Sequence, residues 1–240
     1  MTLSIARNLF PDDKYASKSY RKMRSYLNKY LGTTQILMCS NQWESIVPEK
    51  VPSVCLHKEI KAFINEDLNS CPLLKHENTG NRFPHDPKRV QCRQNFRESL
   101  LKKANLKSKG LFPHQIVSKL LCKKTSSLEN EILKIQWDKI RETQMIEMEK
   151  ESYLSGGTKN SINFGNLIPL SDVSASMSGT PMEVSIALGI MVSELTAPAL
   201  RNRVLTFTSV PTWVRLEEGA SISDKVKTLK SADWGASTNF

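Results

Sequence analysis

Apolar side chains recur at the three- and four-residue spacing of amphipathic helices through the first 150 residues. Tyr20, Met23 and Leu27 form one such stripe, which Gly32 ends. Pro113 opens another, because proline is favoured at the first position of a helix. The pattern predicts a short helix before Pro11 and longer helices over 15–31, 52–65, 89–107, 113–121 and 128–148. We therefore expect an α-helical N-terminal region of helical-repeat-like character, although no repeat period stands out.

The pattern changes after the glycine pair Gly156-Gly157. Strand-like segments now alternate with helical ones, and this order indicates an α/β sheet with a right-handed crossover. The expected strands are 163–170, 203–208 and 212–217, and the expected helices are 180–196 and 223–232. The sequence thus predicts a basic helical region (1–155), a linker (156–162) and an α/β domain (163–240).

Positive charge is concentrated in the helical region. Of the net charge of +10, residues 1–150 contribute 27 Lys/Arg against 16 Asp/Glu, and the segment 82–124 alone holds 12 Lys/Arg against 2 acidic residues. Such a density suits a polyanion such as RNA. The basic helix at 15–31 can bind nucleic acid or a membrane surface, and a solvated outer face is the alternative there. The candidate RNA contacts are Arg89, Arg93, Arg97, Lys102, Lys103, Lys107 and Lys109.

The compartment follows from the apolar runs and the cysteines. No apolar run approaches the roughly 20 residues of a membrane helix, and the first residues lack the apolar core of a signal peptide. The five cysteines are well separated and form no CxxC pair. We expect reduced thiols, a cytoplasmic or nuclear protein, and no membrane partner.

One turn combines hard oxygen ligands with a helix start. Asp172, Ser174 and Ser176 alternate after an apolar strand, so that one carboxylate and two hydroxyls can converge. Such ligands suit Mg²⁺ or Mn²⁺. Thr180 as N-cap and Glu183 three residues later predict a capping box for the following helix. The simpler alternative is that Asp and Ser residues only cap a turn.

These residues also carry a family resemblance. The segment DVSASMSGTPMEVSIALG resembles the metal-ion-dependent adhesion site of a von Willebrand factor A-like domain, with Asp172, Ser174 and Ser176 in the positions of its ligands. SADWGASTNF resembles the second loop of that site, and this likeness implies Thr238 as a further metal contact. In a metal-ion-dependent adhesion site, an acidic side chain of a protein partner completes the coordination. The resemblance therefore implies Mg²⁺ or Mn²⁺ as cofactor and a protein as partner.

The wider match is to a family of uncharacterised plant and large-DNA-virus proteins that join a helical region to such a domain. SIARNLFP, SNQWESIVPEKVPSV, GLFPHQIVSKLL and the site segment occur in that family's order, so the resemblance spans nearly the whole chain. That family is similar to the Ro-type TROVE proteins, whose helical repeats bind RNA, which implies RNA as a further partner. The likeness predicts that this chain holds the first half of the A-like domain, without the later Asp of the site.

Two residues depart from the A-like pattern. Pro169 lies in the strand before Asp172, and proline is confined to edge strands and strand starts, so we expect an edge there. Ala175 replaces a usual glycine, which makes a strained turn less easy.

Catalysis has little support, because the chain has no nucleophile with a base, no paired carboxylates and no phosphate-binding glycine loop. We therefore predict a non-enzymatic binding protein with a Mg²⁺ site for a protein partner and a basic region for RNA. The alternatives are a structural interaction module with an empty site, and an incomplete product without independent function.

Overall fold

The computed structural model describes residues 2–66, 80–102, 105–121, 125–154, 165–207 and 210–232. The described helical region consists of α1 (Thr2–Leu9), α2 (Ala16–Tyr30), α3 (Thr34–Cys39), the 3-10 turns η1 (Trp43–Ser45) and η2 (Pro48–Lys50), α4 (Ser53–Phe63), α5 (Pro87–Leu101), α6 (Pro113–Leu121) and α7 (Ser127–Leu154). The later part consists of β1 (Leu170–Ser171), η3 (Ala175–Met177), α8 (Thr180–Leu195), η4 (Pro198–Leu200), β2 (Arg203–Thr206), β3 (Trp213–Arg215) and α9 (Ile222–Ser231). A helical region followed by a small α/β unit is the predicted class at this level.

The three described strands form a mixed sheet in the order β1-β2-β3. β1 pairs parallel with β2, with Leu170 opposite Leu205, and β2 pairs antiparallel with β3. The parallel pair with α8 between its strands confirms the predicted strand–helix–strand unit. In the described sheet β1 lies at an edge. This agrees with Pro169 just before it, because proline is confined to edge strands and strand starts. The Pro169 carbonyl accepts the Leu205 N–H at 2.9 Å.

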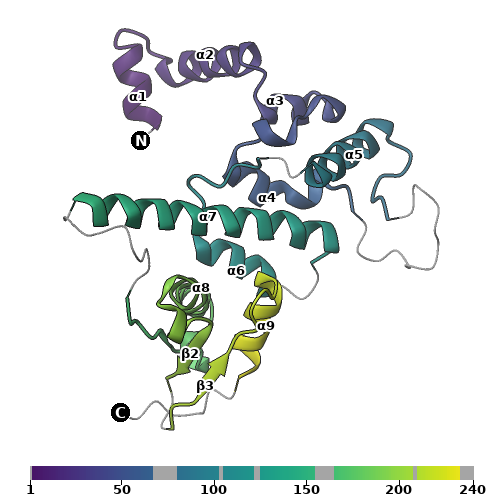
Figure 1. Cartoon of the computed structure of the whole chain (residues 1–240). Helices are drawn as coiled ribbons and strands as arrows, with labels where there is room; N and C mark the ends of the chain where they lie inside the picture. Colours follow the sequence, from purple (N-terminus) through teal and green to yellow (C-terminus); the bar gives the residue numbers. More distant parts are fainter. Residues whose placement is uncertain are drawn as a thin grey trace.

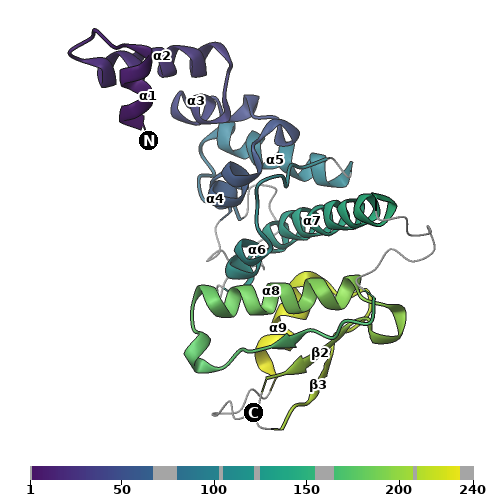
Figure 2. The ribbon, with the colours of Figure 1, turned by 90° about the vertical axis from the view of Figure 1, so that its left-hand side faces the viewer.

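The helices form a stack that ends on the sheet. Figures 1 and 2 show α1 and α2 at one end of the molecule, the long α7 across its middle, α6 between α7 and α8, and the sheet beyond α8. α6 packs closely on α8, while α9 contacts α6, α7 and α8. The predicted linker (156–162) lies outside the described residues, and the division of the chain at that linker stays a prediction.

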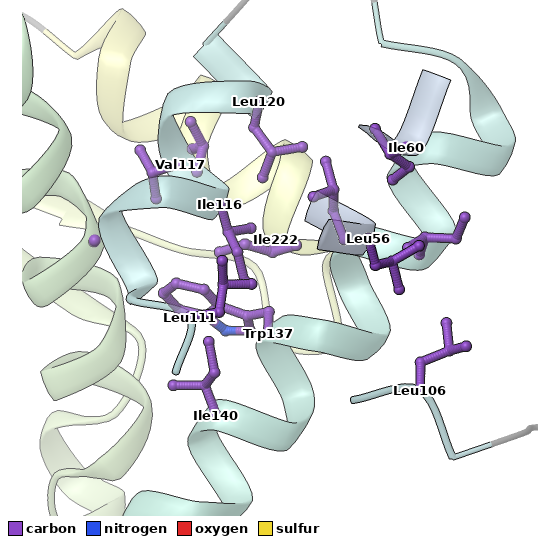
Figure 3. Close-up of a cluster of buried hydrophobic side chains, with 14 of the residues drawn as sticks. Leu56, Ile60, Leu106, Leu111, Ile116, Val117, Leu120, Trp137, Ile140 and Ile222 are labelled. Carbon is purple, nitrogen blue, oxygen red and sulfur yellow. The ribbon is translucent and has the colours of Figure 1, made fainter. Parts of the chain in front are cut away.

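One apolar core runs through both parts of the chain. Near α4 and α5, the rings of Phe63 and Phe96 stack with centroids 5.4 Å apart, and Trp43 meets Phe63 edge-on at 6.2 Å. The same cluster continues through Ile116 of α6 and Trp137 of α7 to residues of α8 and α9. Figure 3 shows Ile116 and Trp137 together with Ile222 of α9. Burial of this cluster therefore stabilises the α/β unit on the helical region.

Most predicted elements are confirmed, and three boundaries differ by more than two residues. The helix predicted over 128–148 continues to Leu154 in α7. The helix predicted to reach residue 107 ends at Leu101. The carbonyls of Leu106 and Lys107 are bound instead by side chains of α7, Lys139 Nζ at 2.6 Å and Gln136 Nε2 at 3.3 Å. Tertiary hydrogen bonds thus replace the helical ones in this segment.

The first predicted strand is also shorter than expected. Residues 163–164 lie outside the described residues, 165–169 are not strand, and β1 begins at Leu170. The hydroxyl of Thr196, just after α8, donates to the carbonyls of Gly165 at 2.8 Å and Leu167 at 2.7 Å. The backbone at Gly165 and Leu167 is therefore held by the end of α8, and hydrogen bonding to β2 begins at Pro169.

Candidate metal centre

The Asp-Ser-Ser turn lies at the carboxyl end of β1 and is held by α8. The Asp172 N–H donates to Ser185 Oγ at 3.0 Å, and Ser171 Oγ donates to the Ser185 carbonyl at 3.3 Å. α8 can approach this closely because of Gly189, where a Cβ would lie 2.2 Å from Ser171 Oγ. The start of the turn is thereby fixed against the helix that follows it.

Within the turn, the three predicted ligand side chains lie close together. Asp172 Oδ1 accepts the Ser174 N–H at 2.8 Å, and the hydroxyls of Ser174 and Ser176 are 2.9 Å apart and hydrogen-bonded. Asp172 is half-buried, Ser174 is buried and Ser176 is exposed. The predicted convergence of two hydroxyls is therefore present, and Asp172 is anchored beside them.

The chemistry of these oxygens fits a small hard cation. Mg²⁺ takes one or two carboxylates and keeps several waters, and an exposed Ser176 leaves room for them. Asp172 Oδ2 has no hydrogen-bond partner in the described part of the chain. Among the described residues, no three His, Cys, Asp or Glu side chains gather as a metal-binding group. Thr238, the fourth predicted ligand, lies outside the described residues.

The predicted capping box is wrong. Gly179, with φ of 89°, is the N-cap of α8, no side chain caps it, and Thr180 is already helical. The positive φ explains the change, because glycine adopts it without the steric cost that threonine would meet. Glu183 instead accepts a hydrogen bond from Ser118 Oγ of α6 at 2.7 Å. The first turn of α8, directly after the candidate site, is thus tied to the helical region.

Ala175, which stands where the A-like pattern usually has glycine, lies in the 3-10 turn η3.

Two of the predicted RNA contacts point into the protein. The Arg89 guanidinium lies 3.9 Å from the centroid of the Trp43 ring and donates to the Ala62 carbonyl at 2.9 Å. Burial lowers the pKa of Arg89. Arg93 is 5% exposed, donates to Asn81 Oδ1 at 3.2 Å and pairs with Glu66 at 3.7 Å. Both guanidiniums thus hold α5 against its neighbours.

The other predicted cations that the structure describes are exposed and lie in two places. Arg97 lies on α5, Lys102 follows its last residue and pairs with Glu98 at 3.8 Å, and Lys103 lies outside the described residues. Lys107 and Lys109 line a groove of about 600 Å³ between residues 105–109, the start of α4 and α7. Lys139 of α7 also lines this groove. Lys139 was missed in the sequence because it follows Lys109 by some 30 residues and no local pattern links the two.

Residues 166–240 match the family described as a domain of unknown function, DUF7788. The whole chain is similar to the uncharacterized protein L728 of Acanthamoeba polyphaga mimivirus, with 35% identity over 239 residues. That alignment covers 99% of this chain and 37% of the viral protein, so the chain spans little more than a third of its relative's length. No solved structure matches the chain.

The matched family segment includes the candidate site. It begins just before β1 and contains Asp172, Ser174, Ser176 and Thr238. The viral similarity extends to the helical region, which packs against that segment through α6. No helix among the described residues is long and apolar enough to cross a membrane.

Proposed function

We propose that this chain is a non-enzymatic binding protein whose Asp172 turn holds Mg²⁺ or Mn²⁺ and, through that ion, a carboxylate of a protein partner. The single observation behind the proposal is the placement of Ser174 Oγ, Ser176 Oγ and the Asp172 carboxylate in one turn at the carboxyl end of β1. In α/β sheets, ligands bind at that end of the strands. The resemblance to a von Willebrand factor A-like domain supports the same assignment.

The charges of the site explain why a partner would be acidic. One carboxylate balances only half the charge of a divalent cation, and the hydroxyls add none. Mg²⁺ held by Asp172, Ser174 and Ser176 would keep a net positive charge and solvent-facing positions occupied by water. A carboxylate from a partner can replace one of these waters, so the ion would join two proteins in the cytoplasm or nucleus.

The second half of the proposal is RNA binding by the basic helical region. Lys107, Lys109 and Lys139 line one groove, and Glu142 is the single acidic residue among the described residues that line it. The exposed side chains of Lys107 and Lys109 can contact phosphates. Lys139 holds the Leu106 carbonyl at 2.6 Å, and Lys107 also donates to the Lys50 carbonyl at 3.2 Å. The excess of positive charge in residues 82–124 supports this half as well.

Calorimetric titration with Mg²⁺ and with Mn²⁺ tests the metal half. We expect saturable heats for the wild type and for an Asp12→Ala control, which removes an exposed carboxylate far from the turn. Asp172→Ala should abolish the heats, and Ser176→Ala should weaken binding. Equal heats for the wild type and Asp172→Ala would contradict the proposal, and negligible heats in both would favour a structural interaction module.

Titration of labelled RNA at several salt concentrations tests the other half. Affinity should fall steeply with salt, because phosphate contacts release condensed counterions. The Lys107→Gln/Lys109→Gln variant should make that dependence shallower. Binding that is absent, or that ignores salt, would contradict RNA as a ligand.

A further inference from the structure

α2 carries a cationic surface of five residues. The helix contains Lys18, Arg21, Lys22, Arg24 and Lys29 and no acidic residue, and all five side chains are exposed. In the described part of the chain none of them is in an ion pair, although lysines elsewhere are, such as Lys88 with Glu44. The charge of this helix is therefore not compensated within the described structure, and it favours a polyanionic ligand.

Aromatic side chains stand among these cations. Tyr26 is 70% exposed and Tyr30 is 80% exposed, and their spacing of four places them side by side on the helix surface. Lys22 and Lys29, four residues before and three residues after Tyr26, are its other neighbours on that surface. Proteins bind single-stranded nucleic acid through exposed aromatic rings flanked by cations, because bases stack on the rings while phosphates contact the positive charges.

The rest of the apolar stripe of α2 belongs to the fold. Ala16 is buried, and Tyr20 and Met23 are half-buried, in a helix that packs against α1. Only the last turns expose their apolar side chains, over a stretch of about 9 Å. That stretch is short for a helix embedded flat in a lipid interface, whose apolar face is exposed along its whole length. A single-stranded ligand needs only the rings and the charges.

We propose that α2 binds single-stranded RNA, with bases stacked on Tyr26 and Tyr30 and phosphates on Lys22 and Lys29. The proposal rests on the RNA half of the proposed function and moves its main contact surface from α5 to α2. Arg89 and Arg93 of α5 are engaged inside the protein, whereas the cations of α2 are unpaired in the described residues. α2 also lies at the end of the molecule opposite the sheet, so RNA on α2 and a protein at the Asp172 turn would not compete (Figure 1).

Fluorescence anisotropy with a labelled 20-nucleotide oligouridylate tests the proposal on the whole chain. Tyr26→Ala should weaken binding by about 5- to 100-fold, the range for one stacked base, while Tyr26→Phe, which keeps the ring, should stay within about twofold. The Lys22→Gln/Lys29→Gln variant should reduce the slope of log affinity against log salt by about 1.4. Lys230→Gln, an exposed lysine on α9, is the matched control and should change neither quantity.

The outcomes separate this proposal from the function on which it rests. If the wild type binds RNA and the α2 variants bind equally well, the assignment of α2 is wrong, and the Lys107→Gln/Lys109→Gln variant then tests the groove. If the wild type binds no RNA at any salt concentration, both ideas fail, and the metal site is unaffected. Sedimentation of the wild type with phosphatidylserine vesicles and its self-association are measured as well. If Tyr26→Ala loses either property while RNA binding persists, α2 belongs to that other ligand and the proposal is overturned.

Discussion

Lys225 of α9 and Glu194 of α8 form an ion pair, with Lys225 Nζ 2.7 Å from Glu194 Oε1 and each side chain 7% exposed. The other carboxylate oxygen of Glu194 accepts from Trp137 Nε1 at 3.2 Å and lies 3.6 Å from Arg141 Nη1, both on α7. Lys225 also donates to Asn202 Oδ1 at 3.3 Å. One buried carboxylate therefore joins α8 and α9 to α7 of the helical region.

Removal of one partner of this pair should be costly. Lys225→Met leaves a buried carboxylate with one cation fewer, and breaking such a pair costs about 3–5 kcal/mol. Urea unfolding measures the loss in the free energy of unfolding. The Glu194→Gln/Lys225→Met double variant should lose less than the sum of the single losses, because it leaves neither charge unpaired. Lys227→Met, which removes the exposed partner of Asp224 on the same helix, is the control and should cost under about 1 kcal/mol. Equal losses for Lys225→Met and Lys227→Met would contradict a buried pair.

Local patterns predicted the elements well where a local signal fixes them. α6 begins at Pro113 as predicted, because proline sets the dihedral angle of a first helical residue. The two hydroxyls of the Asp172 turn also lie together, although Ser176 lies in the 3-10 turn η3 and not in the extended backbone that the alternation argument assumes. The N-cap of α8 was missed because Gly179 supplies the turn through its backbone, and the side chains of Thr180 and Glu183 made a competing, stronger pattern.

Long-range partners could not be predicted. Arg93 is hydrophilic in every local pattern, and its burial depends on Asn81 and Glu66, which precede Arg93 by 12 and 27 residues. Glu194 likewise meets Trp137 across 57 residues. A single sequence contains no periodicity that links such positions, so charge density alone could not distinguish the internal arginines of α5 from the exposed cations of α2.

The corrected helix starts give a contrasting pair of variants. Ser221 is the N-cap of α9, since its hydroxyl accepts the Asp224 N–H at 3.2 Å, whereas Thr180 of α8 makes no such bond. Ser221→Ala should lower the free energy of unfolding by about 1 kcal/mol. Thr180→Ala, an exposed change inside the helix, should stay within about 0.5 kcal/mol. Chemical denaturation measures the free energy of unfolding of both variants. If Thr180→Ala loses as much as Ser221→Ala, Thr180 caps α8 after all, as the predicted capping box requires.

Arg89→Lys tests the internal role of an α5 arginine. Lysine keeps the charge, but it lacks the planar group that stacks on Trp43 and the second nitrogen that reaches the Ala62 carbonyl. We expect a loss of about 1–2 kcal/mol in the free energy of unfolding. RNA affinity should stay unchanged, because the guanidinium of Arg89 is engaged inside the protein. Lys88→Arg, at the neighbouring, partly exposed position, is the control. A loss of RNA affinity without a loss of stability in Arg89→Lys would return Arg89 to the RNA surface.

His57 should make stability depend on pH below neutrality. It is 8% exposed on α4, its Nδ1 has no hydrogen-bond partner in the described residues, and burial, then Lys119 and Lys58, lower its pKa to about 4. Between pH 6.5 and 4 the unfolded chain binds a proton that the folded chain does not, so stability is full above about 6.5 and falls as the pH drops. From pH 7 to pH 4.5, the free energy of unfolding of the wild type should therefore fall by about 2 kcal/mol more than that of His57→Leu. His85→Leu, at an exposed position, should show no such change. Parallel urea titrations of the three proteins at both pH values measure it. If the difference between the wild type and His57→Leu does not change with pH, His57 takes up its proton equally in the folded and the unfolded chain, and the lowered pKa is contradicted.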